Sequence, residues 1–224
     1  MWATDERLIQ SKLESLSKEP IVLSNPEIVI VGGGIAGLCC ARRLHQEGIA
    51  CLILEGSDAI GGRIRTDSVD GFLLDRGFQT LLTSYPEAQK FLDFPSLDLH
   101  SFFPGALIRL NEGFHKLSDP WKSPMAVTRQ LFSSVGSLSD KLRIAKLRWR
   151  VLSASLDDLL TAPETTTLAD LQNSGFSPAI IEQFFRPFFG GVFLEPDLQT
   201  SSRLFHFVFR MFATGKASLP ALGM

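Results

Sequence analysis

The chain has 224 residues, and its 22 basic and 24 acidic side chains give a formal net charge of −2. Hydrophobic residues make up 45% and charged residues 21% of the sequence. This is the composition of a globular protein and excludes a disordered chain, while the near-neutral charge excludes nucleic acid as a main partner on electrostatic grounds. The length is sufficient for one large or two modest domains with a hydrophobic core.

Phenylalanine is distributed unevenly along the chain. There are 18 Phe and a single Tyr; the first Phe is Phe72, and ten Phe lie between Phe176 and Phe212. The sequence therefore has an aliphatic, glycine-containing front part and a Phe-rich back part. A run of Phe at helical spacing predicts a hydrophobic core more often than a binding pocket.

The cysteines and histidines predict no metal site and no disulfide framework. Cys39, Cys40 and Cys51 are too few and wrongly spaced for either, and the four His residues have no metal-ligand spacing. Cys39 and Cys40 are expected to be small apolar residues of a buried helix. Reduced thiols suit an intracellular compartment, and no apolar run reaches the ~18 residues that a membrane span needs.

The first elements in chain order form a predicted βαβ unit. Residues 4–18 are expected to form a short polar helix within an N-terminal extension. Ile28–Val31 is an aliphatic run, a stretch with helical spacing follows as far as Gln46, and Ile49–Leu54 is a second aliphatic run. Continuous aliphatic runs are typical of parallel strands that are buried on both faces.

Hairpins and a short helix are expected next. Asp70–Gly71 suits the positive φ angles of a tight hairpin turn. A helix is expected after Tyr85–Pro86, and Asn111–Gly113 is expected to connect a second hairpin. The ranges predicted for these strands and this helix are 64–69, 72–74, 86–91, 106–110 and 114–117.

The rest of the chain is predicted to be mainly helical. Apolar residues at helical spacing predict one helical stretch over 138–160, namely Leu138, Leu142, Ala145, Trp149, Leu152, Leu156 and Leu159. Thr167 and Ser177 are expected to begin two further helices. The basic residues of the first stretch are typical of a solvated helix face, with contact to an anionic membrane surface as the alternative; they are Lys141, Arg143, Lys146, Arg148 and Arg150.

The six residues that follow the first aliphatic run, Gly32-Gly33-Gly34-Ile35-Ala36-Gly37, satisfy the pattern GxGxxG. In this pattern Gly32 permits a tight turn, Gly34 lets the backbone approach a pyrophosphate, and Gly37 allows close packing of helix on strand. The N-terminus of the following helix offers N–H groups and a partial positive charge to phosphates. Because strand, loop, helix and second strand occur in the required order, the pattern predicts a nucleotide site.

An acidic residue and a second glycine motif follow the second strand. Glu55 is placed to accept hydrogen bonds from a ribose diol and would repel a 2′-phosphate, which disfavours NADP. In Gly61-Gly62-Arg63, the glycines allow close backbone approach and the arginine can bind phosphate oxygens with two hydrogen bonds. Asp75-Arg76-Gly77-Phe78-Gln79 follows the first hairpin.

From Ile28 to Gln79 the chain resembles the flavin-binding N-terminus of the FAD-dependent amine oxidase superfamily. That superfamily contains monoamine and polyamine oxidases, protoporphyrinogen oxidases and phytoene desaturases, and its signature is a glycine-rich fingerprint, then an acid, then Gly-Gly-Arg. The resemblance implies that FAD is the cofactor. It implies the binding residues Gly32, Gly33, Gly34, Ile35, Ala36, Gly37, Glu55, Gly61, Gly62, Arg63, Gly77, Phe78 and Gln79.

Residues 184–193 resemble a substrate-domain segment of the desaturase-like and protoporphyrinogen-oxidase-like branches. The fold expected is α/β, with a Rossmann-like FAD-binding domain over 26–94 and part of an α+β substrate domain over 95–224. The Phe-rich part suits a small apolar or aromatic substrate, such as a polyene or a tetrapyrrole, better than a polycation. No residue is assigned as catalytic, because the flavin carries the redox chemistry in this superfamily.

The function that follows is that of an FAD-dependent oxidoreductase taking a hydride equivalent from an apolar substrate. Two alternatives stay open: a truncated, non-catalytic isoform that self-associates, because the superfamily is longer, and an NAD-dependent dehydrogenase. The resemblance makes a plastid location conceivable, although no transit peptide is visible in the sequence.

Overall fold

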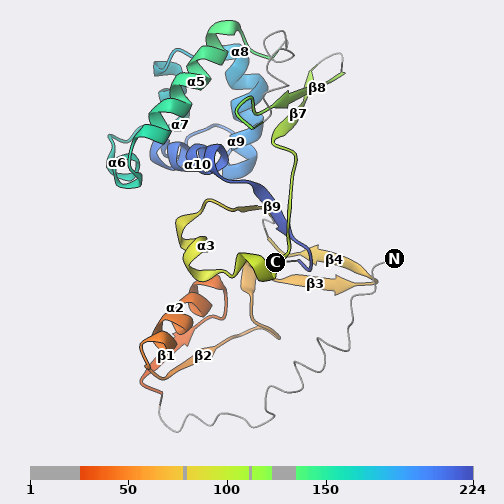
Figure 1. Cartoon of the computed structure of the whole chain (residues 1–224), viewed down its shortest axis with the longest axis vertical. Coiled ribbons are helices and arrows are strands. Elements are labelled where there is room, and N and C mark those ends of the chain that lie inside the picture. The colour runs from red at the N-terminus through yellow and green to blue at the C-terminus, as the bar shows by residue number, and fades with distance from the viewer. Residues whose placement is uncertain (1–25, 78–79, 111–112, 123–134, 224) are drawn as a thin grey trace. The chain divides into compact units, whose positions relative to one another are not determined.

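A parallel strand–helix–strand unit forms the first described part of the chain. The computed structural model describes residues 26–77, 80–110, 113–122 and 135–223. Strand β1 (Ile28–Val31) pairs in parallel with β2 (Cys51–Leu54), and helix α2 (Ile35–Gln46) connects them (Figure 1). The predicted βαβ unit is therefore confirmed, whereas the predicted helix over 4–18 lies outside the described residues.

The chain divides into two compact units, residues 1–65 and 66–224, which we call unit 1 and unit 2. The division comes directly after η1 (Gly62–Ile64), a short 3-10 turn. The cofactor domain predicted over 26–94 spans both units, and that domain boundary stays a prediction.

The aliphatic strands of unit 1 are exposed, contrary to the prediction that they are buried. Val31 is 86% exposed and Val29 50% exposed, and no residue of α2 is buried. The physical reason is that the described residues of unit 1 provide a sheet of only two strands with a single helix. The prediction of a buried helix around the cysteines was also wrong, since Cys40 is exposed.

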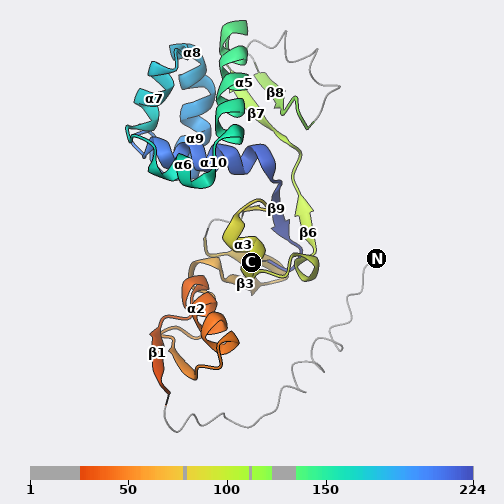
Figure 2. The same cartoon turned by 60° about the vertical axis from the view of Figure 1, so that its left-hand side comes forward.

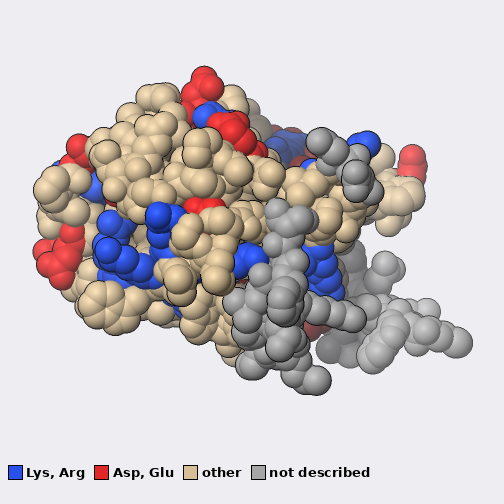
Figure 3. All heavy atoms as spheres, turned by 90° about the horizontal axis from the view of Figure 1, so that it is seen from above, with Lys and Arg blue, Asp and Glu red and all other residues tan. Residues whose placement is uncertain are grey.

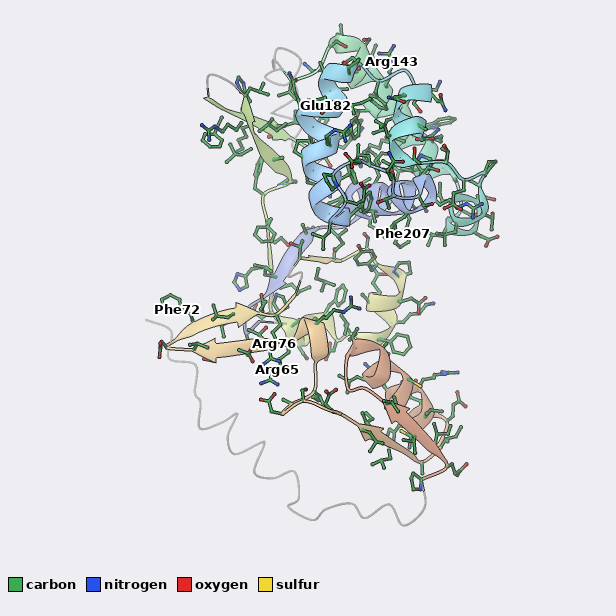
Figure 4. All side chains as sticks on the ribbon, turned by 180° about the vertical axis from the view of Figure 1, so that it is seen from behind. Arg65, Phe72, Arg76, Arg143, Glu182 and Phe207 are labelled. Atoms are coloured by element: carbon green, nitrogen blue, oxygen red, sulfur yellow. The ribbon has the colours of Figure 1, made fainter. Side chains whose placement is uncertain are left out.

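Unit 2 begins with an antiparallel hairpin, β3 (Thr66–Val69) and β4 (Phe72–Asp75). Asp70 and Gly71 both have positive φ, +51° and +82°, which confirms the predicted turn. Phe72 lies at the end of this hairpin with its ring directed away from the strands (Figure 4).

A three-stranded sheet joins distant parts of unit 2. Strand β9 (Ala217–Pro220) lies between β5 (Leu81–Leu82) and β6 (Leu99–Ser101) and is antiparallel to both. Figure 2 shows β6 and β9 side by side. Helix α3 (Pro86–Phe91) and the turn η2 (Phe94–Leu97) lie between β5 and β6 in sequence. A second hairpin, β7 (Gly105–Leu110) with β8 (Gly113–Ser118), confirms the predicted pairing.

Helices form the rest of unit 2. They are α5 (Leu138–Ser153), α6 (Leu156–Thr161), α7 (Thr167–Asn173), α8 (Pro178–Ile180), the π-helical turn η4 (Ile181–Phe185), α9 (Arg186–Phe193) and α10 (Ser202–Thr214). The helix predicted to begin at Thr167 is α7, but its N-cap is Thr166, one residue earlier than expected. The cap predicted at Ser177 is confirmed at the start of α8.

Phenylalanine rings form the centre of the unit 2 core. Phe185, Phe189 and Phe205 are essentially fully buried and contact one another, with the ring centroids of Phe189 and Phe205 4.9 Å apart. Such ring pairs stabilise the core beyond the area that they bury. The interpretation of the Phe run as core is confirmed for Phe176, Phe185, Phe189 and Phe205, which are buried, whereas other rings of the run are only partly buried.

The single helix predicted over 138–160 is two helices. Ala154 is extended, and the Ser155 side chain accepts a hydrogen bond from the backbone N–H of Asp158, whose carboxylate accepts one in return from Ser155. This reciprocal cap begins a new helix. The signal Ser-x-x-Asp was present in the sequence and was missed because the apolar spacing continues across the break.

The apolar stripe that predicted α5 is not the face that the core buries. Leu147 and Val151 are buried with the capping residue Asp140, whereas Leu142 is 66% exposed and Trp149 71% exposed. The apolar pattern on α5 therefore covers two faces, of which the core takes the one that sequence spacing did not select.

Candidate functional site

The glycine loop, residues 32–37, is a sharp turn from β1 into α2. Gly32 has φ +102°, a conformation that other residues rarely adopt, and its N–H donates to the Leu54 carbonyl at 2.7 Å. A Cβ added to Gly37 would lie 2.0 Å from the Gly32 carbonyl oxygen, so the helix packs too closely on the loop for any side chain there. Both glycines therefore have the geometric roles that the sequence predicted.

Gly34 lies open at the start of α2. A Cβ added there would meet nothing within 4 Å in this structure, so its own fold does not require glycine at this position. Gly34 is the N-cap residue and offers no side-chain cap, and the first turn of α2 carries no acidic residue. The first N–H groups of a helix have no partner within it, so this end suits the phosphates of a dinucleotide.

The Gly-Gly-Arg turn, residues 61–63, packs directly on the glycine loop. The Gly61 N–H donates to the Gly33 carbonyl at 2.9 Å, and Gly34 and Gly61 form a parallel bridge. A Cβ on Gly62 would lie 3.3 Å from the Gly34 Cα. Two motifs separated by more than twenty residues thus meet backbone to backbone at the N-terminus of α2.

Glu55 follows β2 and reaches back to the glycine loop. Its carboxylate accepts hydrogen bonds from the Gly33 N–H at 2.6 Å, from the Ser57 N–H at 2.9 Å and from the Ser57 hydroxyl at 2.8 Å. The backbone N–H groups of Ser57 and Gly33, together with the Ser57 hydroxyl, lower the pKa of Glu55 to about 2. Glu55 is therefore an ionised hydrogen-bond acceptor at neutral pH, as a ribose-binding carboxylate must be.

Arg63 is exposed in the Gly-Gly-Arg turn, and within the described ranges no carboxylate forms an ion pair with it. Ile35 and Ala36 are exposed in the first turn of α2. The predicted site residues of unit 1 thus lie around one helix N-terminus. Gly77 lies in unit 2, just after β4, while Phe78 and Gln79 lie outside the described residues.

Sequence reasoning missed three residues that hold the loop between Glu55 and the Gly-Gly-Arg turn, namely Ser57, Asp58 and Arg65. Both terminal nitrogens of Arg65 donate to Asp58, at 2.6 and 2.8 Å. The Ser57 hydroxyl, which also donates to the Ala59 carbonyl at 2.8 Å, aligns the Glu55 carboxylate. An arginine two residues after Gly-Gly-Arg is a weak signal by itself, because many surface arginines have no acidic partner.

A cavity of about 1370 Å³ lies within unit 2, between the β7–β8 hairpin and the helices. Most of its lining residues are apolar, including Phe184, Phe188, Phe212 and the exposed face of α5. Ligand pockets are usually concave, mostly apolar and about 300–1,000 Å³ in volume, so this cavity is large enough for a substrate of several rings or a long chain.

The interpretation of the basic residues of α5 as a solvated face was wrong for one of them. The Arg148 side chain is only 14% exposed, donates to the Ala213 carbonyl at 3.0 Å and lies over the Trp121 ring. Arg148 and Lys141 line the cavity. The pattern could not show this, because the residues that contact Arg148, Ala213 and Trp121, come from distant parts of the chain.

Comparison with known families identifies the fold of this site. The model described as flavin containing amine oxidoreductase matches residues 35–224. The chain belongs to this family. Its cofactor is accordingly FAD, and the expected α/β fold of an FAD-dependent oxidoreductase is confirmed.

Individual relatives of this flavoprotein family match over different lengths. Protoporphyrinogen oxidase 2 of Arabidopsis thaliana is 24% identical over 178 residues, which are 78% of this chain and 34% of that protein. Polyamine oxidase 2 of Arabidopsis thaliana is 40% identical over 53 residues, 24% of this chain and 11% of that one. The chain therefore spans about a third of the length of the first relative.

A solved structure supports the same fold. An oxidoreductase from Methanosarcina mazei superposes with a TM-score of 0.64 at 22% identity, over 88% of this chain and 46% of that chain. At this identity the likeness concerns the fold. None of the helices within the described part of this flavoprotein is long and apolar enough to cross a membrane.

Proposed function

We propose that this chain is the cofactor-binding and substrate-binding part of an FAD-dependent oxidoreductase that acts on an apolar substrate. The observation that carries the proposal is the pairing of the Gly-Gly-Arg turn with the glycine loop, 2.9 Å between the Gly61 nitrogen and the Gly33 oxygen. This pairing presents the two motifs of the flavin signature as one backbone surface at the N-terminus of α2.

In the proposed complex the residues of unit 1 bind and orient the dinucleotide. The N–H groups of Ile35 and Ala36 face the pyrophosphate, Gly34 provides the space for it, and Arg63 neutralises its charge. The ionised Glu55 accepts hydrogen bonds from the ribose hydroxyls. Gly77, Phe78 and Gln79 are proposed to lie near the flavin ring.

When it is bound, FAD is the group that accepts a hydride equivalent from a C–H or C–N bond of the substrate. What this chain adds is an apolar environment that holds the substrate and excludes water. The cavity of unit 2 supports an apolar or aromatic substrate, such as a tetrapyrrole or a polyene, because Asp119 is the only carboxylate among the described residues that line it. A polyamine would require several carboxylates.

The cofactor assignment is tested with Gly34→Val. Because the position is open, the variant is expected to fold, but its side chain would occupy the place of the pyrophosphate. The wild-type chain is expected to be yellow and to release FAD on denaturation, and Gly34→Val is expected to carry none. Gly191→Val is the matched control, since Gly191 is an exposed glycine of α9 with equally open surroundings. Unchanged FAD content in Gly34→Val would refute the assignment.

The substrate class is tested by turnover. Reduction of the bound flavin by a porphyrinogen or a carotenoid precursor, and none by spermidine or spermine, is the expected result. Oxidation of polyamines with no activity on the apolar compounds would contradict the proposal.

A non-catalytic nucleotide-binding form is the second candidate. The exposure of Val31 and of the other strand residues of unit 1 favours it, because an incompletely covered sheet holds a cofactor less firmly. The two candidates differ in one measurement. A chain that binds FAD weakly, self-associates and shows no flavin reduction by any substrate of the tested classes is the non-catalytic form.

A further inference from the structure

Helix α5 carries an exposed apolar stripe in addition to the residues that it buries in the core. The members of the stripe recur at alternating intervals of four and three residues and are Leu138, Leu142, Ala145, Trp149 and Leu152. We call these five residues the α5 seam. Its three leucines and its tryptophan are exposed, from 37% for Leu152 to 71% for Trp149. Exposed apolar residues that are gathered rather than scattered mark an interaction surface.

The spacing of the α5 seam is that of a coiled coil. Alternating intervals of four and three residues give the heptad repeat, in which the a and d positions face a partner helix. In this register Leu142 and Trp149 are a positions, and the other three seam residues are d positions. The residues of α5 that the core buries fall at the c and f positions, on the opposite side of the helix; they are Asp140, Leu147 and Val151. Helix α5 therefore has one face for the core and a second face suited to another helix.

The sides of the α5 seam are positively charged. Helix α5 contains five basic residues and one acid, Asp140, which is fully buried. In the heptad register Lys141 is a g residue and Lys146 an e residue, one on each side of the seam. The other basic g residue, Arg148, is only 14% exposed and donates to the Ala213 carbonyl. Seen from above, Lys and Arg gather over the helical end of unit 2 (Figure 3). Since e and g charges select the partner of a coiled coil, this seam selects negative charge.

The same two features disfavour the other possible occupants of the seam. A second copy of this chain would bring Lys141 and Lys146 against each other or against themselves, depending on the orientation, and like charges oppose pairing in both cases. An anionic lipid surface would be attracted by these lysines. A helix that lies in a lipid surface buries a broad apolar face, however, whereas a strict a/d stripe is narrow.

We propose that the α5 seam binds an amphipathic helix of another protein, with apolar residues at its a and d positions and Glu or Asp beside them. The carboxylates lie next to Lys141 and Lys146, and Trp149, the largest and most exposed seam residue, is the main apolar contact. The inference goes beyond the proposed function, because it concerns unit 2 and not the cofactor residues of unit 1.

The size of the seam determines the strength of binding. From Leu138 to Leu152 it is about 21 Å long at ~1.5 Å per residue, which is about four helical turns. It ends there because α5 ends at Ser153. An interface of one helix on one helix is small, so we expect micromolar affinity and reversible binding. Leu138 and Leu142 also line the unit 2 cavity, so a helix bound along the whole seam extends to that cavity.

The test uses two fluorescently labelled peptides of three heptads, both with Leu at every a and d position. One peptide has Glu at its e and g positions, and the other has Lys there. Like charges keep each peptide from pairing with itself at neutral pH. In anisotropy titrations with the purified 224-residue chain, the acidic peptide is expected to bind about tenfold or more tightly than the basic one. Added salt should reduce the affinity for the acidic peptide.

Two variants separate the apolar contact from the charge contact. Trp149→Ala should weaken binding of the acidic peptide about thirtyfold, the loss expected for a central aromatic contact. Because Trp149 is 71% exposed, the urea midpoint reported by Trp121 should not change. Lys146→Glu, at an exposed position, should weaken binding of the same peptide about tenfold. Leu160→Ala is the matched control, since Leu160 is an exposed leucine of α6 outside the seam, and it should bind as the wild-type chain does.

Four results would overturn the inference. They are binding of neither peptide, equal affinity for both peptides, unchanged affinity in folded Trp149→Ala or in Lys146→Glu, and binding of the chain to phosphatidylserine vesicles without binding of the acidic peptide. A dimer of the wild-type chain in sedimentation velocity that Trp149→Ala abolishes would also contradict it, because the seam would then belong to a second copy. Should Trp149→Ala not fold, Lys146→Glu decides.

Discussion

The two units of this chain use their apolar residues in opposite ways. In unit 2, Phe185, Phe189 and Phe205 are fully enclosed, whereas in unit 1 the aliphatic residues of β1 and β2 are largely exposed, with Val31 at 86%. Unit 1 is nevertheless ordered around backbone contacts, such as those of Gly32 with Leu54 and of Gly61 with Gly33. One unit is organised by side-chain packing and the other by the close approach of glycine backbone.

This difference shows that a strong motif and a buried core are separate properties. Glycines allow two loops to meet because they lack side chains, which is also why they contribute nothing to a hydrophobic core. Substitutions of core residues in unit 2 should therefore reduce folding stability, whereas substitutions of the glycines in unit 1 should reduce the affinity for the cofactor.

Phe205→Ala should cause the largest loss of stability. It removes a fully buried ring that contacts Phe185 and Phe189, and such truncations cost about 3–5 kcal/mol. Urea unfolding followed by the fluorescence of Trp121 and Trp149, both in unit 2, measures it. Val31→Ala, at an exposed apolar position of unit 1, should change the stability of unit 1, followed by amide exchange in β1 and β2, by less than about 0.5 kcal/mol. Similar losses in the two variants would contradict the contrast between the units.

Gly37→Ala should damage unit 1 alone. The new Cβ would lie 2.0 Å from the Gly32 carbonyl oxygen, so the glycine loop must move away from α2. We expect FAD affinity to fall about a hundredfold, ~3 kcal/mol, with no change in the urea midpoint of the unit 2 tryptophans. Faster amide exchange in β1 and β2 should accompany it. Normal FAD titration would show that the close packing at Gly37 is not required.

Asp140 should make unit 2 sensitive to acid. Burial tends to raise its pKa, but hydrogen bonds from the Ser137 hydroxyl and N–H and from the Ser177 N–H and hydroxyl outweigh this and lower the pKa to about 2. Since the unfolded group titrates near 3.8, the ionised carboxylate stabilises the fold above about pH 4, and this is lost as the pH falls towards 2.

The size of that contribution is about 2 kcal/mol. Asp140→Asn should therefore lower the free energy of unfolding at pH 7 by about this amount and flatten its dependence on pH between 4 and 2. Asp157→Asn, at an exposed position of α6, is the control. An unchanged acid profile in Asp140→Asn would mean that other carboxylates cause the acid sensitivity.

Ser155→Ala should have the smallest effect. The Ser155 hydroxyl accepts from the Asp158 N–H at 3.0 Å and begins α6, and loss of such a cap costs about 1 kcal/mol. Urea unfolding gives the value, with Ser153→Ala, at an exposed residue inside α5, for comparison. No measurable change would indicate that packing, not the cap, separates α5 from α6.

Local patterns were reliable where a short stretch of chain determines its own conformation. The turn at Asp70–Gly71, the strand–helix–strand order around the glycine loop and the helix cap at Ser177 all depend on residues close in sequence. On α5 the apolar spacing did not indicate which face is buried, because the helix has apolar residues on two faces. Which face is buried depends on Phe205 and on other residues far along the chain, and no spacing within the helix contains that information.

The candidate site also has some features that local sequence predicts and others that depend on contacts between distant segments. The sequence by itself determined the family, the cofactor and the glycines of the loop, because close backbone approach to a phosphate can be achieved only by a particular spacing of residues without side chains. Only the tertiary structure decided that Gly61 and Gly62 pack on Gly33 and Gly34, and that residues of the β7–β8 hairpin and of α5 line one apolar cavity. These are contacts between distant segments, and they follow from how the helices and strands pack against one another.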